Sequence, residues 1–154
     1  TDPDEMIVRY LAAFGPSAVA DAQSWSGLTG LKGVFGRLRP RLRTFRDERG
    51  RTLYDLARAP LPDAETAAPP RLVPRFDNLV LSHADRSRIL GDFAPSRIVT
   101  NNGLVHATIL VDGLVAGTWQ LEQGRVVLEP FGKLDAEVRR ALKDEAERLE
   151  AFVA

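Results

Sequence analysis

The chain has 154 residues, 44% of them hydrophobic and 27% charged, with 21 basic side chains balanced by 21 acidic ones. This composition is typical of a globular protein with a packed core. Because there is no cysteine and only two histidines are present, disulfides and thiolate zinc sites are excluded, and we expect neither a metal nor a cofactor. No apolar run approaches the ~18 residues of a membrane span, and no signal peptide is evident, so the expected location is the cytoplasm.

The first forty residues have the periodicity of three helices. The first helix is predicted from apolar residues at helical spacing, which are Met6, Ile7, Tyr10, Leu11 and Phe14. Gly15-Pro16 breaks this helix, and Ser17 is the expected N-cap of a second helix over residues 18–25. A third helix is predicted from Leu31, Val34, Phe35 and Leu38, with Thr29 as its N-cap and Pro40 as its end.

Two short extended runs follow the third helix. They are Leu42–Arg46 and Arg51–Leu56, and four residues ending in Gly50 join them. Such a spacing predicts a β-hairpin. Three helices with a tight glycine turn between the second and third, followed by a hairpin, is the order of a winged helix.

Positive charge is concentrated in the same region. Residues 32–51 have a net charge of +6, and the rest of this neutral chain therefore carries −6. A basic segment in a neutral protein indicates a face that meets an anionic partner, here double-stranded DNA. The candidate DNA-binding residues are Lys32, Arg37, Arg39, Arg41, Arg43, Arg46, Arg49 and Arg51. Two alternatives stay open: a solvated basic surface, and a protein–protein module that meets an acidic partner.

Proline divides the chain. Five of the ten prolines lie between Ala57 and Pro74, which predicts an extended connector. We therefore expect a winged-helix domain over residues 1–58, a connector over 59–74 and a second, winged-helix-like domain over 75–154. Because the chain begins at Thr1 without an initiator methionine, we also expect it to be the C-terminal part of a longer protein.

The second domain reads as a β-meander followed by a helix. Strands are expected over residues 105–111, 114–122 and 126–131, joined by two-residue turns at Asp112-Gly113 and Gln123-Gly124. Asp135 is the expected N-cap of a long C-terminal helix, whose apolar stripe extends to Phe152 and Val153. The predicted fold class is α+β: a winged helix, then an antiparallel meander packed with a C-terminal helix.

Four further residues are candidates for either DNA contact or a structural role: His83, Asp85, Arg86 and Trp119. Ser82, His83 and Asp85 have the residue types of a nucleophilic triad, but triad members usually converge from separate elements. A local backbone cap is the preferred interpretation of Ser82 and Asp85, whereas His83 could also donate to a phosphate. Core packing is preferred to base stacking for Trp119.

Three segments of the chain resemble the AlkZ/YcaQ-like winged-helix family, which includes DNA glycosylases. The strongest is Pro-Arg-Phe-Asp-Asn-Leu-Val-Leu-Ser-His-Ala-Asp-Arg at residues 74–86, and the others lie at residues 10–28 and 109–119. The resemblance implies tandem winged helices and a parent protein that excises alkylated bases. It also implies a further, N-terminal winged helix in the same parent chain as a partner.

The catalytic motif of that family has no counterpart here. The resemblance implies a glutamine, a hydrophobic residue and then glutamine or aspartate, in the N-terminal winged helix. The three glutamines of this chain begin Gln23-Ser24-Trp25, Gln120-Leu121-Glu122 and Gln123-Gly124-Arg125. We therefore assign no catalytic residue, and leave open whether the parent is a glycosylase or a non-catalytic DNA-binding or transcription-regulatory protein.

Overall fold

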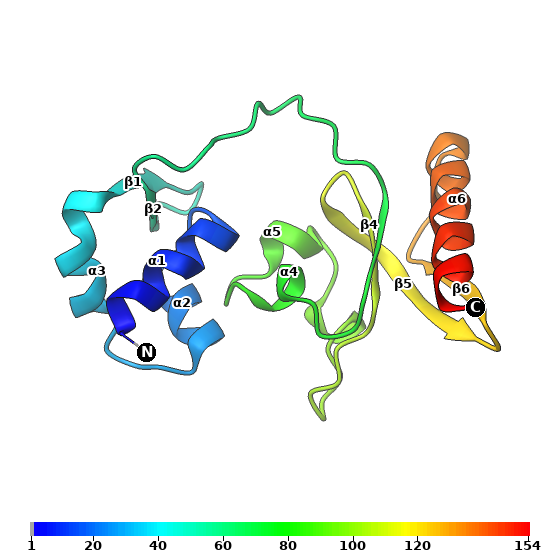
Figure 1. Ribbon diagram of the computed structural model, residues 1–154, viewed down its shortest axis with the longest axis horizontal. Coiled ribbons are helices and arrows are strands. Elements are labelled where there is room, and N and C mark those ends of the chain that lie inside the picture. Colours follow the sequence, from blue (N-terminus) through cyan, green and yellow to red (C-terminus); the bar gives the residue numbers. More distant parts are fainter. Residues whose placement is uncertain (1) are drawn as a thin grey trace. The chain divides into compact units, whose positions relative to one another are not determined.

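The computed structural model describes residues 2–154, so Thr1 lies outside the described residues (Figure 1). Two compact units are present. Unit 1 comprises the chain up to Ala64 together with Leu81–Asp85, and unit 2 comprises Glu65–Val80 and Arg86–Ala154. The mixture of helices, antiparallel strands and a long C-terminal helix confirms the predicted α+β class.

Unit 1 contains three helices followed by a hairpin. The elements are α1 (Pro3–Phe14), α2 (Val19–Ser26), α3 (Lys32–Leu38), the 3₁₀ turn η1 (Arg39–Arg41), β1 (Leu42–Arg46) and β2 (Thr52–Leu56). β1 and β2 are antiparallel, with Leu42 opposite Leu56 and Arg46 opposite Thr52. The predicted element order of this region is confirmed.

Both predicted N-caps in unit 1 were wrong. Helix α2 is capped at Ala18, whose N–H is bound by the Asp21 carboxylate at 2.8 Å. Ser17 is instead buried and exchanges two backbone hydrogen bonds with Tyr54 of β2. Thr29 is not the cap of α3, because that helix begins only at Lys32.

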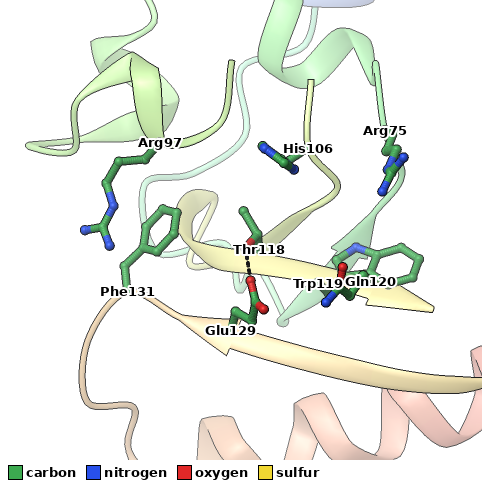
Figure 2. A pocket seen from close by; sticks show the side chains of 8 residues that line it. All are labelled: Arg75, Arg97, His106, Thr118, Trp119, Gln120, Glu129 and Phe131. Atoms are coloured by element: carbon green, nitrogen blue, oxygen red, sulfur yellow. Dashed lines mark hydrogen bonds between the residues drawn. The ribbon is translucent and has the colours of Figure 1, made fainter. Parts of the chain in front are cut away.

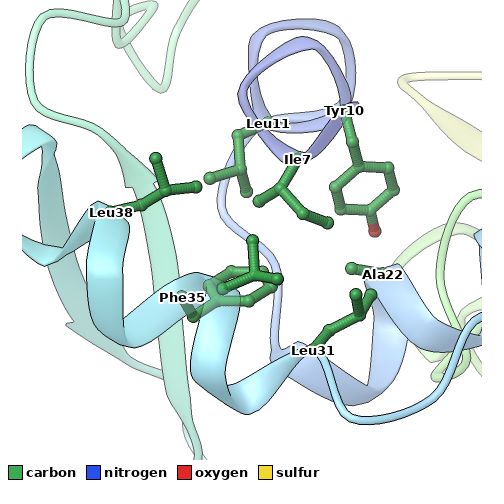
Figure 3. Packing of buried hydrophobic residues seen from close by; sticks show 8 residues of the cluster. Ile7, Tyr10, Leu11, Ala22, Leu31, Phe35 and Leu38 are labelled. Atoms are coloured by element: carbon green, nitrogen blue, oxygen red, sulfur yellow. The ribbon is translucent and has the colours of Figure 1, made fainter. Parts of the chain in front are cut away.

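The core of unit 1 is the apolar stripe of α1 packed against α2 and α3 (Figure 3). Its buried members are Ile7, Tyr10, Leu11, Ala22, Leu31, Val34, Phe35 and Leu38. The 3.6-residue spacing puts one stripe of each helix on the core side, and each large side chain contributes about 1.5–3 kcal/mol by leaving water. Trp25 packs against this core, with its ring centroid 5.0 Å from that of Tyr10.

Unit 2 is built on a four-stranded antiparallel sheet in the order β3-β4-β5-β6. Its elements are β3 (Arg71–Val73), α4 (Asn78–Leu81, whose last residue belongs to unit 1), α5 (Ser87–Leu90), η2 (Pro95–Arg97), β4 (Thr108–Val111), β5 (Leu114–Glu122), β6 (Arg125–Pro130) and α6 (Ala136–Val153). The two predicted turns are confirmed, since Asp112, Gly113, Gln123 and Gly124 all have positive φ angles, as a type I′ turn requires.

Unit 2 has one strand that was not predicted, and it contradicts one expectation. The end of the expected connector, Arg71–Val73, is an edge strand that pairs with β4; three residues beside prolines give too short a pattern to predict. Phe152 was placed on the apolar stripe of the C-terminal helix but is 87% exposed, because only Leu142 and Ala146 of α6 are fully covered by the sheet.

Helix α6 is anchored to the sheet near its end as well as by its apolar side chains. The Glu150 carboxylate accepts hydrogen bonds from the Val126 backbone N–H at 2.7 Å and from Arg125 at 3.0 Å. These donors, the Val126 N–H above all, hold the pKa of Glu150 below its usual value. Asp135 precedes α6 as predicted, although its side chain makes no capping hydrogen bond. Among residues 2–154, no helix is both long and apolar enough to cross a membrane.

Candidate nucleic-acid interface

The eight predicted DNA-binding residues lie on α3, η1 and the hairpin of unit 1. Six of them are exposed, whereas Arg43 and Arg51 are half-buried. A phosphate competes for each guanidinium with any carboxylate already bound to it. We therefore sort these residues by their partners within unit 1.

Arg43 is a structural residue of the hairpin. Its guanidinium donates to the Asp55 carboxylate at 2.7 Å and to the Ala59 carbonyl at 2.8 Å, and it lies 5.3 Å from the centre of the Phe45 ring. The Asp55 side chain is only 1% exposed. Because a buried carboxylate without its counter-ion is costly, Arg43 is committed to the fold.

Arg37 is also paired, although it is exposed. Its guanidinium binds the Asp4 carboxylate in the first turn of α1. The hydrogen bond from Arg37 lowers the pKa of Asp4, and the same bond raises the pKa of Arg37. Both side chains meet solvent, so this pair stabilises the fold only weakly.

Two arginines of the hairpin loop converge on one acidic side chain. Arg49 and Arg51 reach the same Asp85 oxygen, Oδ2, at 3.1 and 2.6 Å. Arg51 also binds Asp47 at 2.6 Å. Although partial desolvation acts to raise the pKa of Asp47, the N–H groups of Arg51 and Arg49 and the Arg51 guanidinium hold it below its usual value.

The remaining cations have no acidic partner. Within residues 2–154, no carboxylate forms an ion pair with Lys32, Arg39, Arg41 or Arg46. Arg39 lies over the Tyr54 ring, 6.0 Å from its centre, and Arg46 donates to the Gly50 carbonyl at 2.8 Å. Both leave donors free for an anion.

Arg58 is a further exposed cation that the sequence analysis did not include. It lies just beyond β2 and lines a hollow of about 450 Å³ with Arg41 of η1. The Ala57 N–H donates to the Arg41 carbonyl at 3.0 Å, which holds the two segments together. Arg58 lies outside the basic segment 32–51, and its position directly after the second strand of the hairpin is the signal that could have identified it.

The segment Ser82–Asp85 is bound to unit 1 by several elements. The Tyr10 hydroxyl donates to the Ser82 carbonyl at 2.7 Å. The buried Asp21 carboxylate accepts the N–H groups of Ala84 and Asp85 at 3.0 and 3.4 Å. Ser82–Asp85 is therefore a clasp, by which we mean a segment held by α1, α2 and the hairpin. The local cap expected of Ser82 and Asp85 stays a prediction.

His83 is positioned between two serine hydroxyls. Its Nε2 lies 3.0 Å from Ser17 Oγ, and its Nδ1 lies 2.9 Å from Ser82 Oγ. The Ser17 hydroxyl proton is directed to the Gly15 carbonyl at 3.1 Å. Since a carbonyl only accepts, Ser17 Oγ must accept from His83 Nε2–H, and Nδ1 accepts from Ser82. In this arrangement each ring nitrogen of His83 faces a serine hydroxyl, whereas in a triad one nitrogen faces the serine and the other faces a carboxylate.

A family model for AlkZ-like DNA glycosylases matches residues 1–152 of the chain. The chain belongs to the AlkZ-like DNA glycosylase family. Among solved structures, it is similar to the DNA glycosylase AlkZ of Streptomyces sahachiroi, with a TM-score of 0.79 and 23% sequence identity over 96% of this chain. The chain spans 42% of the length of that protein. No curated protein matches the chain.

The other candidates of this AlkZ-like chain lie in unit 2. Trp119 is half-buried, and its indole N–H donates to the Val73 carbonyl of β3 at 2.9 Å. Arg86 is half-buried, and its Nε has no hydrogen-bond partner among the described residues. Gln120 donates to Glu122 at 2.6 Å on the surface of β5. In the described part of the chain, no group of three or more metal-ligating side chains is present.

Proposed function

We propose that this chain binds double-stranded DNA as the C-terminal part of an AlkZ-like repair protein that acts on alkylated DNA. In this proposal unit 1 is a winged helix, α3 and η1 approach the DNA, and the β1–β2 hairpin is the wing. The matched Streptomyces protein is longer than this chain, which is compatible with further domains in the parent chain. We propose that one of them is an N-terminal winged helix and that the protein acts in the cytoplasm.

The observation that carries the proposal is the set of unit 1 cations that form no ion pair among the described residues. The candidate phosphate ligands are Lys32, Arg39, Arg41, Arg46 and Arg58. Each gains an ion pair when a phosphate approaches, whereas a paired arginine must first lose one. Arg37, Arg49 and Arg51 are therefore secondary ligands, and Arg43 supports the wing from within.

This arrangement favours affinity without sequence preference. Contacts to phosphates fix the position of a protein on the duplex, but they do not read the bases. Non-specific binding of this kind has a dissociation constant of about 10⁻⁴–10⁻⁶ M at physiological salt. A repair protein needs this property, because damaged bases arise in any sequence.

The test is a fluorescence anisotropy titration of the 154-residue chain against three duplexes of unrelated sequence. We expect similar affinities for the three, and a clear loss of affinity in the triple variant Arg39→Gln, Arg41→Gln and Arg46→Gln. Unchanged affinity in that variant would remove this surface from the DNA interface. Poly-glutamate as a competitor separates DNA binding from binding of an acidic protein. If the surface recognises phosphates, poly-glutamate should not displace the DNA; displacement would show that any polyanion suffices.

A second candidate function is a non-catalytic DNA-binding or transcription-regulatory module. For this chain by itself it is supported by the three glutamines, none of which begins a glutamine–hydrophobic–glutamine or –aspartate motif. The polar candidates point the same way: His83 and Asp85 are engaged in the clasp, and Gln120 is bound to Glu122. The resemblance would place that motif in the N-terminal winged helix, so the glutamines do not decide between the two candidates for the parent protein. Enzyme-dependent release of a base by this chain alone would reject this second candidate.

A further inference from the structure

Unit 2 contains a half-open pocket of about 300 Å³ on its sheet (Figure 2). Its lining residues are Arg75, Arg97, His106, Thr118, Trp119, Gln120, Glu129 and Phe131. All belong to unit 2. The pocket is at the lower end of the range for small-molecule sites.

The basic side chains of the pocket are unpaired. Among residues 2–154, no carboxylate forms an ion pair with Arg75 or Arg97. Arg97 is held by stacking, with its guanidinium carbon 3.9 Å from the centre of the Phe131 ring. The His106 ring projects into the space between the two arginines (Figure 2). Its main chain is fixed by a 2.8 Å hydrogen bond from its N–H to the Ile98 carbonyl.

The one carboxylate of the pocket is occupied. Glu129 accepts a hydrogen bond from the Thr118 hydroxyl at 3.2 Å, and the two residues are opposite each other on β5 and β6. The β6 backbone lies so close to position 117 that only glycine fits there, because a Cβ would lie 2.5 Å from the Glu129 carbonyl oxygen. One Glu129 oxygen is thus held by Thr118 on the sheet. Two arginines against one carboxylate leave the lining of the pocket with a net charge of +1.

A buried hydroxyl without a hydrogen-bond partner among the described residues lies next to the pocket residue Thr118. Thr108 of β4 is opposite Thr118 in the strand register, so the two side chains project from one face of the sheet. The Thr108 hydroxyl is completely buried and has no hydrogen-bond partner within the described residues. Thr108 is not among the residues that line the pocket, so this hydroxyl is not part of the proposed site.

We propose that this pocket binds the phosphate group of a nucleotide. Two guanidinium groups and an imidazole line the pocket, and their charge and hydrogen-bond donors suit a phosphate. The rings of Trp119 and Phe131 add apolar walls for the group that the phosphate carries. The shared chemistry is a phosphate ester, either of a free mononucleotide or of a nucleic-acid strand. The proposal does not depend on the basic surface of unit 1.

The chain offers its own internal control for the test. It has two histidines and two tryptophans; His106 and Trp119 line the pocket, whereas His83 and Trp25 belong to unit 1. We would titrate the whole chain at constant pH with inorganic phosphate, thymidine 5′-monophosphate and a four-nucleotide thymidine strand, and follow the side-chain NMR signals. Saturable shifts are expected for His106 and Trp119 with thymidine monophosphate, but not for His83 and Trp25.

Variants decide which groups bind. Arg75→Gln should weaken thymidine monophosphate about tenfold or more, because a charge-assisted hydrogen bond is lost. Arg75 is exposed and carries no ion pair, so this variant should fold. Arg140→Gln, an equal change of charge on the exposed side of α6, should have no effect. The variant Arg41→Gln/Arg58→Gln should also retain the His106 shift, which separates this proposal from the DNA-binding proposal.

Three results would overturn the proposal: no saturable His106 shift, equal binding by the Arg75→Gln variant, or phosphate alone binding as tightly as the nucleotide. The last result would remove the nucleotide from the assignment. If the strand binds more tightly than the mononucleotide, the ligand is a nucleic-acid strand, and the reverse order identifies a free nucleotide.

Discussion

The salt dependence of DNA binding gives the sharpest test of which basic residues of unit 1 neutralise phosphates. Five cations of unit 1 form no ion pair within residues 2–154: Lys32, Arg39, Arg41, Arg46 and Arg58. If each neutralises one phosphate, then at about −0.9 per phosphate the log–log slope of affinity against salt is about −4.5. Between 50 and 200 mM salt the affinity should then fall about 500-fold.

Removing the two arginines of one hollow should change this slope by a known amount. The double variant Arg41→Gln/Arg58→Gln leaves three contacts, so the slope should become about −2.7 and the loss over the same salt range about 40-fold. The assay is anisotropy of a labelled 20-base-pair duplex at five salt concentrations. Arg140→Gln/Lys143→Gln on α6 is the control with the same change in net charge, and its slope should stay near −4.5.

A second double variant tests whether arginines that are already paired with carboxylates contribute less to phosphate binding. Arg49→Gln/Arg51→Gln removes two cations that are already bound to Asp85 and Asp47, so we expect a smaller change in slope. If its slope falls as far as that of Arg41→Gln/Arg58→Gln, the ion pairs open on DNA and the reasoning from partners is wrong. An unchanged slope in Arg41→Gln/Arg58→Gln would refute the proposed contacts.

Three other predictions follow from single contacts. Arg43→Gln should lower the free energy of unfolding of unit 1 by about 3 kcal/mol, because it leaves the buried Asp55 charge unpaired; urea unfolding would measure this, and a loss below about 1 kcal/mol would contradict it. The pKa of Glu150 is lowered in the folded protein, so the stabilising contact of Glu150 is complete above its unfolded pKa and is lost as the pH falls through its folded pKa. Protection of the Val126 amide from hydrogen exchange should therefore decrease in that acidic range. The variant Glu150→Gln should abolish this pH dependence. This chain alone should release no base from an N7-alkylated duplex above the spontaneous background; release that His83→Ala abolishes would place chemistry in the clasp instead.

Local patterns determined much of the fold. The apolar spacing of α1 and α3, the break at Gly15-Pro16 and the two-residue turns each depend on neighbours within a few positions. Sequence therefore predicted the order of helices and hairpins in unit 1 and the meander of unit 2. The resemblance of three segments to the AlkZ/YcaQ-like family added the family, which the match over residues 1–152 confirmed.

Tertiary structure decided what individual polar residues do. Ser17 fits a helix cap by its position, yet a backbone pairing with Tyr54 and the His83 ring engage it instead. Asp85 fits a local cap, yet it binds arginines more than thirty residues earlier in the chain. Periodicity carries no signal for such partners, because they are brought together only when distant segments pack.

The same reason separates the equivalent arginines of the basic segment. By sequence alone, Arg41 and Arg43 are the same residue type two positions apart. In the fold, Arg43 faces Asp55 across the hairpin, and Arg41 lines an open hollow with Arg58. The sequence determined where positive charge is concentrated, and the tertiary structure decided which of those charges remain available to bind an anion.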